Sequence, residues 1–193
     1  MPRPMTERER EAFLAEPRTA ILSVAAGGGR PPLAVPIHYA YEPGGDVTFF
    51  TDTQRRTSRK TKLLAHTGGR FTLTVQNPEW PYRFVTVECT VVREDVPPST
   101  EQILRVAQPH MGEEVARGLA ASEVDDPETT MVLYTARPDR WFAMDFSEDA
   151  GVRTPARPAA TPRAAPRRRR SSRRPSARWR SATTAGRGGS SRR

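Results

Sequence analysis

The fold is decided by the stretch VTFFTDTQRRTSRKTKLL, residues 47–64. Its first five residues, Val47–Thr51, are β-branched or aromatic and predict a β-strand. Its last part begins at Ser58, a good N-cap residue, and predicts a short helix to about His66 with Leu63 and Leu64 as apolar contacts. The stretch therefore predicts a strand and a helix joined by a cationic connection.

Six further segments of strand length flank this stretch, and they are rich in Val, Thr, Phe and Tyr. They are residues 19–25, 33–41, 71–76, 84–92, 130–135 and 141–146. Glycine-containing turns at 27–29 and 42–46 separate the first three strands of the chain at hairpin spacing. This spacing predicts an antiparallel meander, and so a mainly β fold rather than alternating strands and helices.

Two capping boxes, Thr6–Glu9 and Ser99–Gln102, predict one helix each. The first helix is charged and runs to about Glu16. The second has an apolar face over residues 103–107. Two glycines beyond that face leave open whether the second helix continues toward Ala121.

The chain has 193 residues and a formal net charge of +9, but this charge is divided unevenly. Residues 151–193 hold 14 Arg and neither Asp nor Glu, so the first 150 residues hold 17 basic against 22 acidic residues. The arginine-rich segment lacks the apolar residues that a core needs, so we predict one folded domain over 1–150 and a disordered tail over 151–193. The tail is either a polybasic arm for nucleic acid or a C-terminus without a function of its own. Nucleic acid is a partner only in the first case.

Several classes of protein are excluded by what the sequence lacks. A single cysteine, Cys89, excludes a disulfide framework and a cysteine-rich zinc module. Three scattered histidines give no metal-ligand spacing, so we expect no metal site. There is no apolar run long enough for a membrane span, and the charged N-terminus is not a signal peptide, so we expect a cytoplasmic protein. No nucleophile motif or spaced carboxylate pair identifies a catalytic residue.

The cationic connection holds the clearest candidate for a binding site. Both lysines of the chain, Lys60 and Lys62, lie here among three arginines and several hydroxyl side chains. Cations and hydroxyls at a helix N-terminus are the groups that bind a phosphate monoester or diester. The glycines of a Walker loop are missing. A solvated cationic turn on an acidic domain is the alternative, and composition alone does not decide between the two.

Trp80 and Tyr82 lie at a proline-rich turn before the strand 84–92. Their rings either stack on a planar ligand or close the end of a barrel.

The order of these segments resembles the pyridoxamine 5′-phosphate oxidase-like flavin-binding split barrel. The resemblance is carried by LAVPIHY (33–39), a Gly-Gly turn, VTFFT (47–51) and SRKTKLL (58–64), and the strands RFTLTV (70–75) and YRFVTVE (82–88) continue it. It covers about residues 6–146. It implies a six-stranded antiparallel split barrel that forms a homodimer, with FMN or the deazaflavin F420 at the interface between the subunits.

The resemblance also implies which residues contact the cofactor. The cofactor phosphate would be held by Lys60, Lys62, Ser58, Arg59 and Thr51. The isoalloxazine ring would lie along the backbone around Val35, Pro36 and Ile37. The side chains of Trp80 and Tyr82 would approach the ring or the substrate from the following hairpin.

Two features depart from the family pattern. Glu88 is followed by Cys89 where many relatives carry Gly. The Arg- and Trp-bearing C-terminal segment with which pyridoxine phosphate oxidases hold their substrate is not recognisable, because the arginine-rich tail stands in its place. We therefore expect an oxidoreductase that uses FMN or F420 on a small organic substrate that the sequence does not identify, and this departure from the family pattern argues against vitamin B6 oxidation. A non-catalytic binder of flavin, F420 or haem, and a nucleic-acid-associated protein acting through the tail, are the alternatives.

Overall fold

A computed structural model describes residues 1–53 and 55–147. These residues form a mainly antiparallel β structure, as predicted, with four helices. Three of the helices were predicted, and the fourth lies where a continuation of the third was left open. The predicted tail, residues 151–193, and the predicted domain boundary at residue 150 lie outside the described residues.

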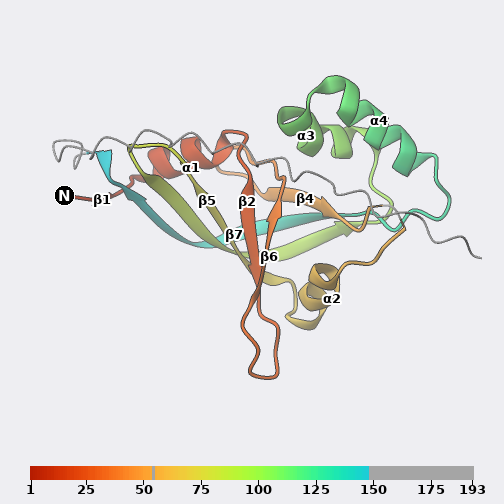
Figure 1. Cartoon of the computed structure of the whole chain (residues 1–193), viewed down its shortest axis with the longest axis horizontal. Coiled ribbons are helices and arrows are strands. Elements are labelled where there is room, and N and C mark those ends of the chain that lie inside the picture. Colours follow the sequence, from red (N-terminus) through yellow and green to blue (C-terminus); the bar gives the residue numbers. More distant parts are fainter. Residues whose placement is uncertain (54, 148–193) are drawn as a thin grey trace, which may run out of the picture. The chain divides into compact units, whose positions relative to one another are not determined.

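Six strands follow one another in the antiparallel order β3-β2-β5-β6-β7-β4 (Figure 1). Their bounds are β2 Ala20–Val24, β3 Leu33–Ile37, β4 Val47–Thr51, β5 Arg70–Gln76, β6 Arg83–Asp95 and β7 Val132–Asp145. These are the six strands of the predicted split barrel. A seventh strand of two residues, β1 (Arg3–Pro4), pairs with the end of β7 and was not predicted.

The last strand corrects the prediction of two separate strands near the end of the sheet. The segments 130–135 and 141–146 belong to one long strand, β7, which continues through the polar residues 137–140. The ladder with β6 shifts register between Glu88 and Cys89 and again between Val91 and Arg93. Such bulges allow a long strand to bend while it stays paired. The sequence did not predict one continuous strand, because the exposed charged residues at 137–140 interrupt its apolar pattern.

The capping boxes and the Ser58 cap are confirmed. Thr6 caps α1 (Glu7–Ala15), Ser58 caps α2 (Arg59–His66) and Ser99 caps α3 (Thr100–Met111). Gly112, at a φ of +81°, ends α3, because this conformation is open to glycine and costly for other residues. The segment beyond it is a separate helix, α4 (Glu113–Val124), rather than a continuation.

The barrel core is built from alternate residues of the strands. Leu22, Leu73 and Val87 face one another across β2, β5 and β6, and all three are fully buried. A second, smaller apolar cluster joins Ile103, Ala120 and Met131 to Phe50 of β4. This cluster fixes α3 and α4 beside β4 (Figure 1).

Candidate functional site

The barrel is open between β3 and β4. Their hairpin has one isolated bridge, between Ala40 and Thr48. Continued along both strands, this register would oppose Tyr39 and Phe49 and then three further pairs: His38 and Phe50, Ile37 and Thr51, Pro36 and Asp52. None of these pairs forms a ladder among the described residues.

Two local features explain why the strands separate. Pro36 has no N–H to donate to a ladder, so it is suited to the edge of a sheet. Asp52 has a φ of +65°, the left-handed conformation, which ends the extended backbone of β4. The split of the barrel therefore follows from one residue on each side of it.

A cavity of about 310 Å³ occupies this opening. It is lined by all six residues of the three separated pairs and by Thr19, Thr53 and Lys60. Four residues that the sequence assigned to a cofactor meet here: Pro36, Ile37, Thr51 and Lys60.

Four other predicted residues lie near the cavity without lining it. Val35 packs against the barrel core, and Ser58 caps α2. Arg59 and Lys62 are exposed on α2. The cationic segment is thus divided between one cavity-facing lysine and several solvent-facing cations.

Asp52 is the centre of a hydrogen-bond network that sequence reasoning missed. One of its carboxylate oxygens, Oδ1, accepts hydrogen bonds from the Ser58 amide (2.7 Å), the Thr61 hydroxyl (2.8 Å) and the Thr51 hydroxyl (3.1 Å). The residue is only 5% exposed. The Thr51 hydroxyl, which was predicted to hold a phosphate, and the Ser58 amide at the start of the helix are therefore already bound to a carboxylate of the chain itself.

Lys60 presents a desolvated positive charge to the cavity. Its side chain is half-buried, and this burial lowers the pKa of the ammonium group while the nearby Asp52 carboxylate raises it. Among the described residues, no acid lies within ion-pair distance of the ammonium. Removal of an ammonium from water without an ion-pair partner is unfavourable, so this group favours an anionic ligand.

Arg55 differs from Lys60 because its charge is satisfied within the chain. Its guanidinium donates to both carboxylate oxygens of Asp126 at 2.7 Å and to Glu128 at 2.7 Å. These contacts tie the segment after β4 to the segment before β7. Arg55 is therefore a structural cation.

His38 is the second residue of the cavity wall that was not assigned from the sequence. Its ring stacks on that of His110, with centroids 4.5 Å apart and planes 5° from parallel. The Nε2 of His110 lies 2.8 Å from the carbonyl oxygen of Tyr39, so this nitrogen carries the proton and donates. Burial lowers the pKa of His38, and the neighbouring His110 lowers it further.

The two missed residues could have been found from hairpin pairing. Counting outward from the Gly44-Gly45 turn sets His38 opposite Phe50 and Asp52 opposite Pro36. This register could have been predicted from the sequence. The sequence does not show, however, that the two strands separate at these residues and leave a cavity between them.

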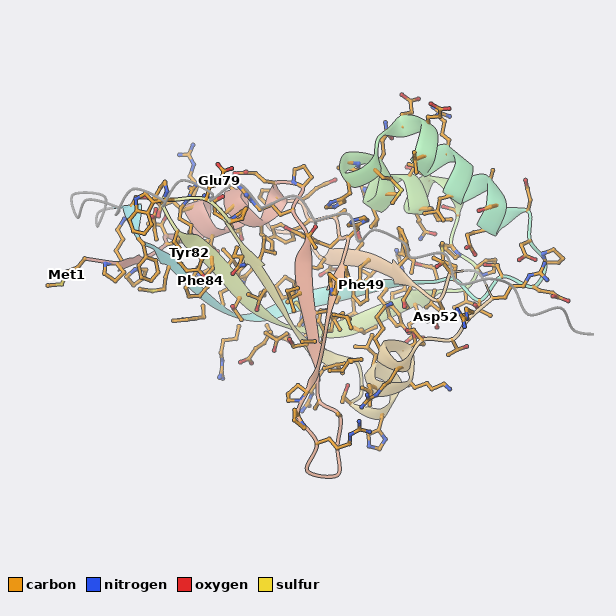
Figure 2. The ribbon with its side chains drawn as sticks, viewed as in Figure 1. Met1, Phe49, Asp52, Glu79, Tyr82 and Phe84 are labelled. Carbon is orange, nitrogen blue, oxygen red and sulfur yellow. The ribbon has the colours of Figure 1, made fainter. Side chains whose placement is uncertain are left out.

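Trp80 and Tyr82 do not line this cavity within one copy of the chain. Figure 2 shows Tyr82 with Phe84 near β1 and Asp52 beside α2. A second concavity of about 450 Å³ shares Thr19 with the first and extends over Ile21, Thr74 and Gln76. The Tyr82 hydroxyl donates to Gln76 Oε1 at 3.3 Å, so Tyr82 contacts a residue that lines this second concavity.

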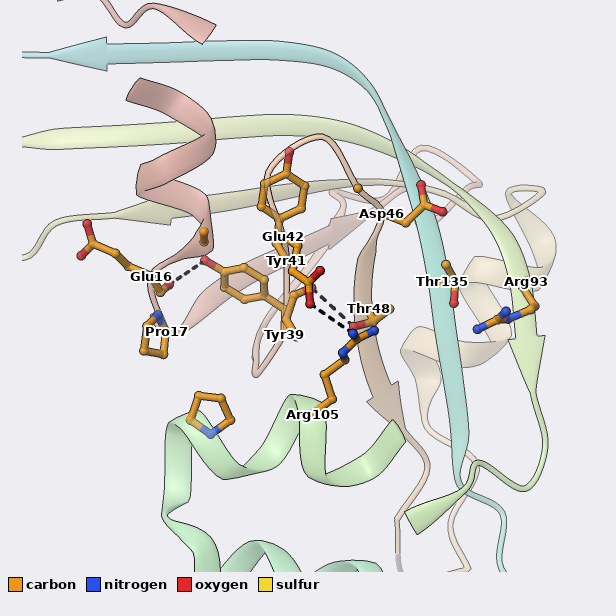
Figure 3. Close-up of a pocket in the computed structure, with 14 residues that line it drawn as sticks. Glu16, Pro17, Tyr39, Tyr41, Glu42, Asp46, Thr48, Arg93, Arg105 and Thr135 are labelled. Atoms are coloured by element: carbon orange, nitrogen blue, oxygen red, sulfur yellow. Dashed lines mark hydrogen bonds and ion pairs between the residues drawn. The ribbon is translucent and has the colours of Figure 1, made fainter. Parts of the chain in front are cut away.

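A separate cavity of about 510 Å³ lies between the end of α1, the β3–β4 hairpin and α3 (Figure 3). Both of its arginines are already paired, since Arg105 binds Glu42 at 3.1 Å and Arg93 binds Asp95 at 3.0 Å. The Tyr39 hydroxyl likewise donates to the carbonyl oxygen of Leu14 at 2.8 Å. This cavity offers a ligand no desolvated charge comparable with Lys60.

Comparison with solved structures identifies the fold. The chain is similar to an F420 reductase (19% identity, 68% of this chain and 94% of that one, TM-score 0.54) and to an FAD-binding protein from Mesorhizobium loti (17%, 75% and 96%, 0.52). It is also similar to a protein assigned as a pyridoxamine 5′-phosphate oxidase from Listeria innocua (12%, 71% and 96%, 0.50). The chain therefore has the fold of the pyridoxamine 5′-phosphate oxidase-like split barrels, as the sequence resemblance predicted. No protein-family model and no curated protein sequence matches it.

Two further observations concern only residues 1–53 and 55–147. No group of three or more His, Cys, Asp or Glu side chains is arranged to hold a metal ion. None of the helices has the length and apolar character needed to cross a membrane.

Proposed function

We propose that this protein is an oxidoreductase that holds FMN or F420 in the cavity between β3 and β4 and acts on a small organic substrate. The observation that carries the proposal is the half-buried Lys60 ammonium in the cavity wall, without an ion-pair partner among the described residues. A cofactor phosphate would supply the missing negative charge. The likeness of fold to an F420 reductase and an FAD-binding protein supports a flavin-type cofactor.

The free edge of β3 supplies groups for a planar ring. β3 pairs with β2 along one edge, and its other edge borders the opening of the barrel. Alternate residues of an edge strand direct their N–H and C=O groups away from the sheet, where a ring with polar edges can bind them. This geometry supports the expectation that the backbone at Val35–Ile37 lies along the cofactor ring.

The bound cofactor ring supplies the hydride chemistry, and the chain supplies binding and orientation. Lys60 would hold the phosphate, the β3 edge would fix the ring, and His38 would border the reacting side of the cavity. No side chain has to act as an acid or base for hydride transfer itself.

The proposal includes a homodimer. The ladders align five outer-face residues in one row across the sheet: Pro36, Ile21, Thr74, Thr86 and Phe142. Ile21 and Phe142 are 40% and 60% exposed, which is high for large apolar side chains. The row begins at Pro36 in the cavity wall, so a second copy packed on the row would also cover the cavity.

The cofactor can be identified directly. The chain is purified from a host that makes both FMN and F420, and the visible spectrum and mass of the co-purified ligand are measured. We expect a bound flavin or deazaflavin. A colourless protein that binds neither compound on titration would contradict the proposal.

The role of Lys60 is tested by substitution. A charge-assisted hydrogen bond contributes about 1.5–3 kcal/mol, so Lys60→Ala should weaken FMN or F420 binding roughly ten- to a hundredfold. Lys62→Ala should have a smaller effect, because Lys62 is exposed. Affinity is measured by fluorescence titration.

Riboflavin is the control for this experiment, because it has the ring of FMN without the phosphate. It should bind the original protein and both variants almost equally. A change of less than about twofold in FMN and F420 affinity for Lys60→Ala would show that the lysine is not the phosphate anchor.

A further inference from the structure

Asp52 brings a negative charge to the cavity that the proposed cofactor has to tolerate. It lines the cavity together with Lys60 and is nearly fully buried. Burial limits the screening of its charge by water, so a charge on a ligand in the cavity interacts with it strongly.

The same carboxylate removes the donors that a highly charged phosphate needs. The Thr51 and Thr61 hydroxyls and the Ser58 amide all donate to Asp52 Oδ1. The Ser58 hydroxyl in turn accepts from the Thr61 amide at 3.3 Å, which caps α2. The loop that resembles a phosphate cradle is therefore closed around an anion of its own.

The balance of charge in the cavity favours a phosphate group of low charge. Lys60 contributes one positive charge and Asp52 one negative charge. A phosphomonoester such as that of FMN carries close to two negative charges above pH 7, because its second pKa is about 6. A phosphodiester carries one negative charge and needs fewer donors.

We propose that Asp52 is a specificity-determining residue, which makes this cavity select a flavin-type cofactor whose side chain bears a phosphodiester over one with a terminal phosphomonoester. F420, whose side chain contains a phosphodiester, belongs to the favoured class. This inference rests on the proposed function, because it assumes that the cofactor phosphate lies next to Lys60.

The test compares two ligands with the same ring. FMN and its phosphate monomethyl ester differ by one methyl group, which removes an ionisable hydroxyl and leaves the ester a monoanion, and riboflavin serves as the uncharged reference. All three are titrated into the full-length protein at pH 7.5 by fluorescence. We expect the dissociation constant of the methyl ester to be at least about tenfold lower than that of FMN.

Asp52→Asn is the decisive variant. Asparagine tolerates the left-handed backbone conformation and keeps an oxygen that accepts hydrogen bonds, while the charge is removed. In this variant FMN should bind at least as tightly as its methyl ester. Asp46→Asn is the matched control, because Asp46 is an exposed acid of the β3–β4 turn outside this cavity, and it should leave the preference of the original protein unchanged.

The outcomes separate this inference from the proposed function. Equal or tighter binding of FMN to the original protein, or a preference that persists in Asp52→Asn, would overturn the role of Asp52 and leave the cofactor site intact. If neither phosphate ester binds more tightly than riboflavin and Lys60→Ala has no effect, the cofactor site itself is wrong. Melting temperatures of the variants confirm that each one is folded.

Discussion

The stacked rings of His38 and His110 connect the cavity wall to the last turn of α3. Protonation of both rings would put two positive charges 4.5 Å apart in a partly buried site. Protonation of His38 is therefore opposed by burial and by the neighbouring His110.

This arrangement predicts a dependence of stability on pH. Burial and His110 lower the pKa of His38 in the folded protein, so the unfolded chain binds the proton more readily. The free energy of unfolding should be highest above about pH 6.5, the ordinary histidine pKa. It should fall as the pH decreases from there through the lower pKa of folded His38. Urea denaturation at a series of pH values measures this fall.

The three histidines of the chain make the pKa itself measurable by proton NMR. His38 should titrate below the ordinary value, and His110→Phe, which keeps a stacking ring without a charge, should restore it only in part. His66→Gln is the control, because His66 is exposed at the end of α2. A His38 signal with an ordinary pKa would show that the ring is not desolvated by the stack.

Some residues that line the cavity could be predicted from the sequence and others could not. Lys60 belonged to the cationic segment that was predicted as a binding site, but the sequence did not separate it from Arg59 and Lys62, which are exposed. Asp52 and His38 could not be predicted, since the role of Asp52 depends on a left-handed backbone conformation and that of His38 on a contact with a residue 72 positions away. The sequence counted Arg55 among the cations of the candidate binding segment, whereas in the structure its guanidinium binds Asp126. This ion pair could not be predicted, because Asp126 lies on a distant segment of the chain.

The helices depend on their caps. Ser99 Oγ accepts from the Gln102 amide at 3.3 Å, and Gln102 Oε1 accepts from the Ser99 amide at 2.7 Å. Ser99→Ala should therefore lower the free energy of unfolding by about 1 kcal/mol. Urea denaturation measures the change.

The neighbouring residue provides the control for this prediction. Thr100 is the first residue of α3, is exposed and makes no side-chain cap, so Thr100→Ala should change stability much less. Equal losses for the two variants would mean that the cap is not the source of the effect.

The elements themselves were largely predictable because their signals are local. Capping boxes fixed the starts of α1 and α3, and the strand Val47–Thr51 was predicted with its observed bounds. β7 was not predictable as one strand, because bulges against β6 keep it continuous through residues that read as a turn. The sequence also did not decide whether the helix before Gly112 continues beyond it, because that depends on the φ angle of Gly112 in the folded chain.

The whole molecule should be a homodimer if the outer row of the sheet is an interface. Sedimentation at micromolar concentration should give the mass of two chains. Phe142→Arg should shift the equilibrium toward monomer, because a buried unpaired guanidinium opposes packing on the row. Val115→Arg is the matched control, since Val115 is 59% exposed on α4, away from the row. A monomer that binds the cofactor with full affinity would contradict a site covered by two copies.

The pairing of β1 and β4 with β7 affects how the chain folds during its synthesis. Translation proceeds from the N-terminus, so Thr51 is synthesised about eighty residues before its partner Val132. At roughly 5–20 residues per second this delay lasts about 4 to 16 seconds, during which β4 is an apolar strand without its ladder. The barrel can be completed only after β7 has been synthesised. A chain released before that point would leave β1 and β4 without the ladders that they form with β7, and β6 without one of its two ladders.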